Sequence, residues 1–423
     1  MNNPTFKSLG ICGSLLRVME EIGYDQPTPI QAQAIPAVLA GSDLLGIAQT
    51  GTGKTAAFSL PIVDALLAQG ARARSKCPRV LILSPTRELA GQIRDEVARY
   101  TKGLPVRHAC VFGGVSQRPQ EKVLAAGVEV LVATPGRLLD LADSRLVDLG
   151  EVTHLVLDEA DRLLDMGFIR DVRKIINKLP KDRQSLLFSA TMPARVAKLA
   201  QDILREPVRV DVSPEVVTVE KIQQGVLLVE TSQKQEVLER LLSDPDVTRA
   251  IVFTRTKHGA NRVAKKLEKA GIKAEAVHGN KSQNARQRAL DSFKAGRAWV
   301  LVATDVAARG IDIQGISHVI NFELPHEPES YVHRIGRTAR AGSSGVAWSL
   351  VDSSEIKRLR DVQRLTGVVV QQLAFTGPDA ELEPVDMPVA QAPKQHANGA
   401  QNSGKKKNGR RRRRRRHGPK SAA

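Results

Sequence analysis

The sequence predicts an α/β protein made of two tandem domains, each a parallel sheet covered by helices, followed by a disordered basic C-terminal tail. Short apolar runs alternate with helical patterns over most of the 423 residues, as in sheets that are buried on both faces. The second half also repeats the first. Residues 130–134 (VLVAT) return letter for letter at 300–304, and 80–83 resembles 250–253 at the same offset of 170 residues. A repeat of this length indicates two copies of one domain.

The domain boundaries follow from breaks in this alternation. We place the first domain at 1–206 and the second at 207–376, because Pro207, Pro214 and a β-branched stretch interrupt the pattern there. The tail, 377–423, is rich in Pro, Ala, Gln, Asn and Gly, a composition that cannot bury a core. The expected strands are 44–47, 80–83, 106–112, 130–133, 154–157 and 185–188, then 250–253, 300–304, 318–322 and 346–349.

The positive charge is concentrated in the tail. The net charge is +18, and residues 391–423 hold 12 Lys and Arg and no Asp or Glu, which leaves +6 for 1–390. A charge run is usually only solvated. Seven consecutive arginines at 410–416, however, concentrate attraction to a polyanion.

Other features of the composition exclude whole classes of protein. The sequence has no run of about 18 apolar residues, so we expect no membrane segment, and its N-terminus lacks the pattern of a secretory signal. The three cysteines are an odd number without C-x-x-C spacing. We therefore expect a reduced, intracellular compartment and neither a disulfide framework nor a zinc site.

Residues 48–55, AQTGTGKT, fit the phosphate-binding pattern G-x-x-x-x-G-K-[ST] with alanine in place of the first glycine. An apolar run precedes the loop and a helical pattern follows it, which is the context that this motif needs. Loop N–H groups and the helix N-terminus would cradle phosphates, Lys54 would reach the β- and γ-phosphates, and Thr55 would hold Mg²⁺. The alternative is a glycine-rich turn that binds nothing. The predicted nucleotide-binding residues of the loop are Thr50, Gly51, Thr52, Gly53, Lys54 and Thr55.

The apolar strand at 154–157 is followed by three carboxylates within Asp158-Glu159-Ala160-Asp161. Ligands of parallel sheets bind beyond the C-terminal ends of the strands. We expect Asp158 to hold Mg²⁺, largely through water, and Glu159 to be the general base that polarises the attacking water. The alternative is an acidic helix N-terminus that the helix dipole favours.

Residues 333–340, HRIGRTAR, carry arginines at three-residue spacing, which on a helix makes one cationic face. The second copy of the domain lacks a Gly-Lys-Thr loop and should bind no nucleotide at its own equivalent position. We therefore expect Arg337 and Arg340 to reach across an interdomain cleft to ATP on the first domain, where such a group is worth about 10³–10⁵ in rate. A basic surface helix is the alternative.

This ordered set of motifs resembles the DEAD-box ATP-dependent RNA helicases, and within that family the bacterial RhlE group. The resemblance covers residues 6 to about 375 and implies two RecA-like domains. It rests on Phe6, PTPIQ at 27–31, AQTGTGKT at 48–55, PTRELA at 85–90, Gly113-Gly114, TPGR at 134–137, DEAD at 158–161, Ser189-Ala190-Thr191, IVFTRT at 251–256, TDVAARGID at 304–312 and HRIGRTAR at 333–340.

The resemblance implies further residues for ATP and Mg²⁺. Gln31 is implied to read the adenine edge, with Phe6 packing on the base, which selects ATP because a buried amide rejects a mismatched edge. Gly310 and Asp312 are implied to touch the ribose and phosphate side from the second domain. Ala48 in place of the first loop glycine is normal for the family.

The resemblance also implies contacts with RNA. Ser189 and Thr191 are implied to link the ATP state to RNA binding, and we group His333 with them as a bridge to the carboxylates. Backbone contacts carry no sequence information, and with 3% aromatic residues base stacking is not expected to be the main mode. We expect sequence-independent binding that recognises the 2′-OH. The implied RNA contacts are Arg87, Gly114, Thr134, Gly136, Arg137, Arg255, Gly279, Arg286 and Thr304.

One departure from the family pattern concerns Ala339. It stands between Arg337 and Arg340, where many relatives have glycine. We expect this position to lie on a helix, where an added methyl group is tolerated.

We therefore expect RNA-stimulated ATP hydrolysis coupled to domain closure, with local, non-processive unwinding of short RNA duplexes or remodelling of RNA–protein complexes. The alternative is an ATP-gated RNA clamp or annealing chaperone, because the tail 391–423 would add non-specific RNA affinity. The motif set disfavours a P-loop transport or DNA-motor ATPase. The resemblance favours a bacterial cytoplasm, although an arginine run can also serve nuclear import. The RNA pathway stays open, as do ribosome or ribonuclease partners.

Overall fold

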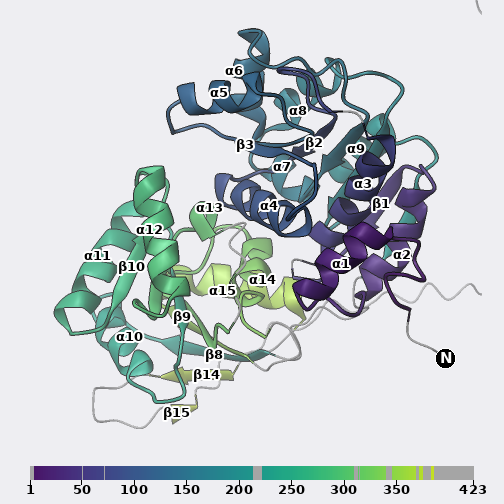
Figure 1. Cartoon of the computed structure of the whole chain (residues 1–423). Helices are drawn as coiled ribbons and strands as arrows, with labels where there is room; N and C mark the ends of the chain where they lie inside the picture. Colours follow the sequence, from purple (N-terminus) through teal and green to yellow (C-terminus); the bar gives the residue numbers. More distant parts are fainter. Residues whose placement is uncertain are drawn as a thin grey trace, which may run out of the picture. The chain divides into compact units, whose positions relative to one another are not determined.

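The computed structural model of the chain (Figure 1) describes residues 4–49, 51–70, 72–212, 222–308, 313, 315–339, 345–367, 371–374 and 383–384. Several predictions fall outside these residues. They are those for Thr50, Gly310, Asp312, Arg340 and the tail 391–423.

The first sheet contains strands from the expected apolar runs and one more. Among the described residues its strands are β1 (Leu44–Ile47), β2 (Val80–Leu83), β3 (His108–Val111), β4 (Val130–Ala133), β5 (His154–Leu157), β6 (Gln184–Ser189) and β7 (Val208–Asp211). They are parallel and follow the order β3-β4-β2-β5-β6-β1-β7.

Helices cover both faces of this sheet, as Figure 1 shows. Val80 and Ile82 pack into a core with the first four helices, and the alternate residues Leu81 and Leu83 pack into a second core with the later ones, because successive side chains of a strand point to opposite faces. The helices are α1 (Gly13–Glu21), α2 (Pro29–Leu39), α3 (Lys54–Gln69), α4 (Arg87–Tyr100), α5 (Arg118–Ala125), α6 (Pro135–Asp143), α7 (Ala160–Asp165), α8 (Ile169–Ile176) and α9 (Ala194–Ile203).

The second sheet is built in the same way. Its described strands are β8 (Ile222–Leu228), β9 (Ala250–Phe253), β10 (Ala274–Val277), β11 (Val300–Ala303), β12 (His318–Asn321), β13 (Gly345–Val351), β14 (Gln371–Ala374) and β15 (Glu383–Pro384). Their order is β10-β11-β9-β12-β13-β8-β14-β15, and all pairs are parallel except β14 with β15.

The helices of the second sheet also divide between two cores. The two helices within 234–269 pack on one face of the sheet, and the α-helices within 283–366 pack on the opposite face. These elements are α10 (Lys234–Leu242), α11 (Lys257–Lys269), α12 (Gln283–Lys294), α13 (Asp305–Ala308), α14 (Pro328–Ile335), the 3₁₀ turn η2 (Ser353–Glu355) and α15 (Ile356–Thr366).

The strand orders confirm the internal repeat. The identical segments β4 and β11 occupy the same position in the two sheets, as do β2 and β9, β5 and β12, and β6 and β13. The correspondence extends to helix caps. Thr86 Oγ1 accepts a hydrogen bond from Leu89 N at the start of α4, and Thr256 Oγ1 accepts one from Gly259 N at the start of α11, as N-cap threonines do.

Two predicted boundaries need correction. Strand β7 (Val208–Asp211) pairs with β1, so the first sheet continues past residue 206, where we expected the second domain to begin. Strand β15 (Glu383–Pro384) pairs with β14, so the second sheet includes residues that we assigned to the disordered tail 377–423. Composition missed β7 because only one of its four residues is buried, and it missed β15 because a two-residue strand that contains a proline has no apolar pattern.

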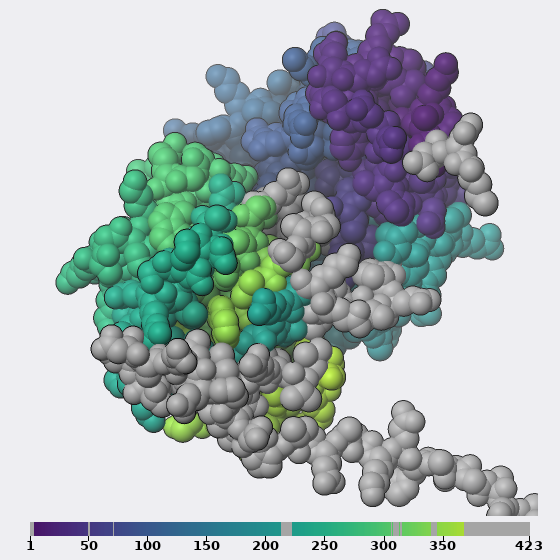
Figure 2. Space-filling view, turned by 90° about the horizontal axis from the view of Figure 1, so that it is seen from below, coloured from purple at the N-terminus to yellow at the C-terminus, as the bar shows by residue number. Residues whose placement is uncertain are grey.

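The N-terminal residues form part of the folded surface. In Figure 2 they appear in dark purple as a continuous patch, and Phe6, Leu15 and Met19 are buried beneath it in the first core. Within the described part of the chain, no helix is long and apolar enough to cross a membrane.

Candidate nucleotide and nucleic-acid sites

The loop between β1 and α3 has the geometry of a phosphate cradle. Gly51 and Gly53 have φ angles of +89° and +92°, a left-handed conformation that favours glycine. A Cβ atom on Gly53 would lie 2.3 Å from Gln31 Nε2. Lys54 begins α3, is buried, and donates from Nζ to Ala48 O at 2.8 Å, while Thr52 Oγ1 donates to Gln49 O at 2.8 Å.

Gln31 connects this loop to the segment before α2. Its Oε1 accepts from Thr28 N at 2.9 Å, and its Nε2 donates to Gly53 O at 3.0 Å and to Tyr24 Oη at 2.7 Å. Phe6 stacks on Tyr24, with ring centroids 5.5 Å apart. Sequence reasoning missed Tyr24, although it lies seven residues before Gln31. Contacts of Gln31 and Phe6 with adenine stay predictions.

The predicted carboxylates lie at the C-terminal end of β5. Asp158 and Glu159 are both 2% exposed. Burial raises the pKa of Asp158 even though the nearby charge of Lys54 lowers it. Burial alone would also raise the pKa of Glu159, but the charges of Arg162, Lys54 and Arg337 outweigh it and lower the pKa. Glu159 is therefore ionised, as a general base must be.

Arg162 is a second residue that the sequence reasoning missed. Its Nη1 lies 2.6 Å from Glu159 Oε2, and both side chains are buried. Glu159 itself has a φ angle of +50°, which is uncommon for a residue with a side chain. The three-residue spacing of Glu159 and Arg162 on a helical turn was the available signal.

The predicted coupling residues Ser189 and Thr191 contact Asp161. Thr191 donates from both N and Oγ1 to Asp161 Oδ2, each at 3.0 Å. Ser189 Oγ accepts from Asp161 N at 3.2 Å and donates to Thr191 O at 2.8 Å. The segment after β6 is therefore hydrogen-bonded to the carboxylate segment after β5.

The arginine segment differs from the expected cationic helix face. Helix α14 ends at Ile335, before Arg337. Arg334 is buried at 1% exposure and donates to both carboxylate oxygens of Asp305, at 2.6 and 2.8 Å. This residue therefore forms an ion pair inside the second domain. Arg337 is also buried; its Nε donates to His333 O at 3.3 Å, and its charge acts on Glu159.

The expectation for Ala339 was wrong. It lies beyond the end of α14 and has a φ angle of +55°. A residue with a side chain costs about 1 kcal/mol of stability in this left-handed region. The methyl group of Ala339 is therefore destabilising.

The second domain has a lysine at the position of Lys54. Lys234 begins α10 after β8, as Lys54 begins α3 after β1. It is 1% exposed, and its Nζ binds Asp352 Oδ2 at 3.0 Å, Phe322 O at 3.2 Å and a carboxylate oxygen of Glu355. Lys234 is therefore bound by two internal carboxylates, whereas Lys54 donates to a backbone carbonyl of its own loop.

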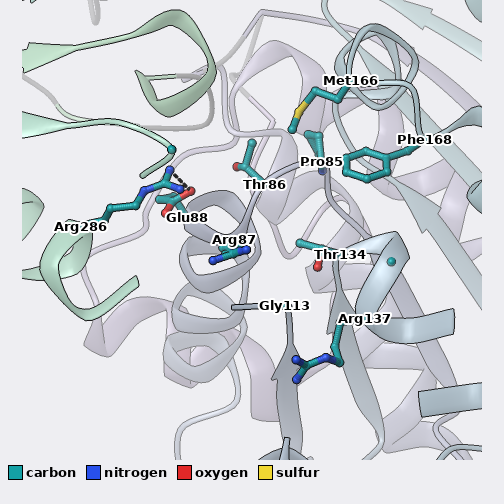
Figure 3. A pocket seen from close by; sticks show the side chains of 12 residues that line it. Pro85, Thr86, Arg87, Glu88, Gly113, Thr134, Arg137, Met166, Phe168 and Arg286 are labelled. Carbon is teal, nitrogen blue, oxygen red and sulfur yellow. Dashed lines mark ion pairs between the residues drawn. The ribbon is translucent and has the colours of Figure 1, made fainter. Parts of the chain in front are cut away.

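Predicted RNA contacts line one pocket of about 350 Å³ (Figure 3). Arg286 Nη2 pairs with Glu88 Oε2 at 2.9 Å, and Gln283 Nε2 donates to Glu88 Oε1 at 2.9 Å. Arg87, Arg137 and Arg286 all line this pocket, and burial together with the charge of Arg286 lowers the pKa of Arg87. The predicted residues in the lining are Arg87, Thr134, Gly136, Arg137, Gly279 and Arg286.

Three predicted RNA residues are not in that lining. Gly114, with φ +76°, follows the lining residue Gly113, and a Cβ on it would lie 2.0 Å from Arg87 Nη1. Thr304 follows β11 and is buried. Arg255 donates to Glu323 from its N at 2.7 Å and from Nη2 at 3.2 Å.

The residues present fit a nucleotide with Mg²⁺. Asp158 is a buried carboxylate whose raised pKa a cation would lower, and partly exposed Thr55 follows Lys54 at the mouth of the loop. No cluster of three or more His, Cys, Asp or Glu side chains suited to a metal occurs in the described ranges. A hard cation held mainly by phosphates and water needs few protein ligands.

Comparisons with known proteins give family and sequence matches over most of the chain. Residues 28–199 match the DEAD/DEAH box helicase family, and residues 233–342 match the helicase conserved C-terminal domain. The chain is 43% identical over 362 residues to the DEAD-box ATP-dependent RNA helicase CshA of Bacillus cereus, covering 86% of this chain and 68% of the relative. The corresponding CshA of Geobacillus kaustophilus is 42% identical over 379 residues, which cover 90% and 80%.

Solved structures show the same likeness. Dbp5 of S. cerevisiae bound to RNA and ADP BeF3 superposes with a TM-score of 0.77 and 32% identity, covering 88% of this chain and 95% of that chain. Mss116 bound to single-stranded RNA and UDP-BeF gives a TM-score of 0.79 with 29% identity, covering 89% and 81%.

Proposed function

Because this chain belongs to the DEAD-box family of ATP-dependent RNA helicases, which are RNA-dependent ATPases, we propose that it hydrolyses ATP between the 48–55 loop and the carboxylates after β5. One observation carries this proposal. Lys54, Asp158 and Glu159 are buried, and their charges act on one another. Two carboxylates and a lysine in one buried cluster are suited to a phosphate with a cation.

Each residue of the cluster has a distinct task. Lys54 and the N–H groups of the loop bind the β- and γ-phosphates, and Asp158 with Thr55 would hold Mg²⁺, which supplies charge neutralisation when bound. Glu159 orients the attacking water and accepts its proton, since its lowered pKa keeps it ionised. The water oxygen bonds to the γ-phosphorus as the bond to the β–γ bridging oxygen breaks.

The state of this site is linked to RNA through the segment 189–191. Asp161 lies two residues after Glu159 and accepts two hydrogen bonds from Thr191. We assign RNA backbone binding to Arg87, Thr134 and Arg137 in the pocket of Figure 3. Arg337, whose charge acts on Glu159, would stabilise the charge on the γ-phosphate during transfer.

The test is the variant Glu159→Gln, measured as RNA-stimulated phosphate release. Glutamine keeps the shape of the side chain but cannot accept the proton, so we expect the rate to fall at least about 100-fold while ATP and RNA still bind. Glu20→Gln, on an exposed position of α1, is the matched control and should retain full activity. Normal turnover in Glu159→Gln would contradict the role of Glu159.

A second candidate function rests on the arginine run 410–416. Polyarginine attracts any polyanion, so the chain could anneal RNA strands or act as an ATP-gated clamp. A chain ending at Met387 retains β15 and removes the run. If unwinding persists and annealing disappears in this truncation, the helicase activity belongs to the two sheets and annealing to the tail.

Finer assignments extend the same proposal. We place the chain in the RhlE-like group of a bacterial cytoplasm, on the motif set that it shares with that group. We also propose that it acts with ribosomes or a ribonuclease. Crosslinking of bound RNA in cells, followed by sequencing, identifies the RNA and tests these assignments.

A further inference from the structure

The pocket of Figure 3 has two chemically different sides. Arg87, Arg137 and Arg286 bring positive charge, and the other side presents Pro85, Met166 and Phe168. Figure 3 shows these three apolar side chains gathered at one end, with Thr134 between them and Arg137. Phosphate contacts explain the arginines, but they give no reason for an apolar wall beside them.

The basic side still has capacity for anions. Within the described part of the chain, Arg137 Nε and Nη1 and Arg286 Nε have no hydrogen-bond partner, and the carboxylate oxygen of Asp140 lies 4.0 Å from Arg137 Nε. Glu88 is the carboxylate in the pocket lining, against three arginines. Buried N–H donors without partners cost free energy, so this side favours a ligand with more than one anionic oxygen.

The apolar wall is partly exposed and fixed in place. Met166 and Phe168 follow α7 and are neither buried nor fully exposed. Their backbone N–H groups donate to Arg162 O at 3.0 Å and Leu163 O at 3.0 Å, and Gly167 between them has φ +81°. Phe168 also packs on the second core of the first domain, so its position is set before any ligand binds.

We propose that one nucleotide of bound RNA packs its base or ribose ring against Phe168 and Met166 while its phosphates lie on the arginines. This inference rests on the assignment of the pocket to RNA. A nucleotide combines anionic phosphates with less polar rings, which matches the two sides of the pocket. Because every nucleotide has these rings, the wall adds affinity without selecting sequence. Its contribution is also independent of salt, unlike that of the arginines.

The experiment measures affinity for a labelled ten-nucleotide oligouridylate at several salt concentrations. Phe168→Ala should weaken binding about tenfold, since an apolar contact of this size is worth about 1.4 kcal/mol, with the salt slope unchanged. Phe168→Tyr, which keeps the ring, should bind like the parent. Arg137→Ala should weaken binding and reduce the salt slope by about one. An oligouridylate with single abasic positions then shows whether the base or the ribose makes the contact.

The outcomes separate this inference from the RNA assignment of the pocket. If Arg137→Ala loses affinity while Phe168→Ala stays within twofold of the parent, the pocket binds RNA and the apolar contact is wrong. A changed salt slope in Phe168→Ala also overturns it, because the arginines would then have moved. If Arg137→Ala binds normally, the RNA assignment itself fails. If Phe168→Ala does not fold, Met166→Ala removes the other side chain of the apolar wall and should likewise weaken binding with the salt slope unchanged.

Discussion

Lys54 and Lys234 occupy equivalent positions in the two domains, and we predict that the first binds nucleotide while the second stabilises the fold. Both lysines begin the helix that follows the equivalent strand. Lys234 is bound by Asp352 and Glu355, which are 7% and 0% exposed. Burial alone would raise the pKa of Asp352, but hydrogen bonds from Ser354 and Lys234 lower it to about 2. Lys234→Met leaves two buried carboxylates without this cation, which costs about 3–5 kcal/mol.

The assay uses the tryptophans of the chain. There are two, Trp299 and Trp348, and both belong to the second sheet region, so their fluorescence reports unfolding of the second domain alone. With a slope of about 2 kcal/mol per molar urea, Lys234→Met should lower the midpoint by about 2 M. Lys54→Met should leave this midpoint unchanged and abolish ATP hydrolysis.

A compensating variant checks the cause. Adding Asp352→Asn and Glu355→Gln to Lys234→Met removes the unpaired charges, and replacing a whole buried ion set is close to neutral, so most of the lost stability should return. An unchanged urea midpoint in Lys234→Met, or a triple variant that is less stable than the single one, would contradict this role of Lys234.

Three further predictions concern single positions. Burial lowers the pKa of His154 to about 4, so below pH 6.5 the unfolded chain takes up a proton that the folded chain does not. The free energy of unfolding should therefore fall as the pH drops from 6.5 towards 4, by about 2 kcal/mol at pH 5, and His154→Gln should remove this dependence. Ala339→Gly relieves the positive φ and should raise the thermal midpoint of the second domain, with a gain of about 0.5–1 kcal/mol; a lower midpoint would contradict the left-handed backbone there. Gly53→Ala forces a Cβ to within 2.3 Å of Gln31 and should destroy ATP binding in a titration, whereas Gly91→Ala on α4, with nothing within 4 Å, should retain it.

The fold could be predicted largely because its signals are repeated. Buried strands such as β4 and β11 are continuous apolar runs, and their identical sequences reveal the duplication. Strands β7, β8, β10, β14 and β15 were not among the expected strands. Polar residues interrupt the apolar pattern of β8 (IQQGVLL), β10 (AEAV) and β14 (QQLA). Only one of the four residues of β7 is buried, and β15 has two residues, one of them a proline. Neither strand has an apolar periodicity from which it can be recognised.

The positions of site residues could be predicted where a motif fixes the backbone geometry. They could not where a long side chain can bind any of several partners. The glycines of the 48–55 loop and Asp158 follow from spacing. Arg334 did not, because an arginine in a basic segment can bind Asp305 in the interior or face solvent, and sequence spacing is the same in both cases. The left-handed backbone of Ala339 was hidden for a similar reason, since it depends on where α14 ends.

We infer that the ATP site and the RNA pocket are coupled through Asp161 and the segment 189–191. The direct test is RNA affinity with and without a non-hydrolysable ATP analogue, in the parent and in Thr191→Val, which lacks the hydroxyl bound to Asp161. We predict that the analogue tightens RNA binding by at least about fivefold in the parent and by much less in Thr191→Val. Equal RNA affinity of the parent with and without the analogue would contradict this coupling.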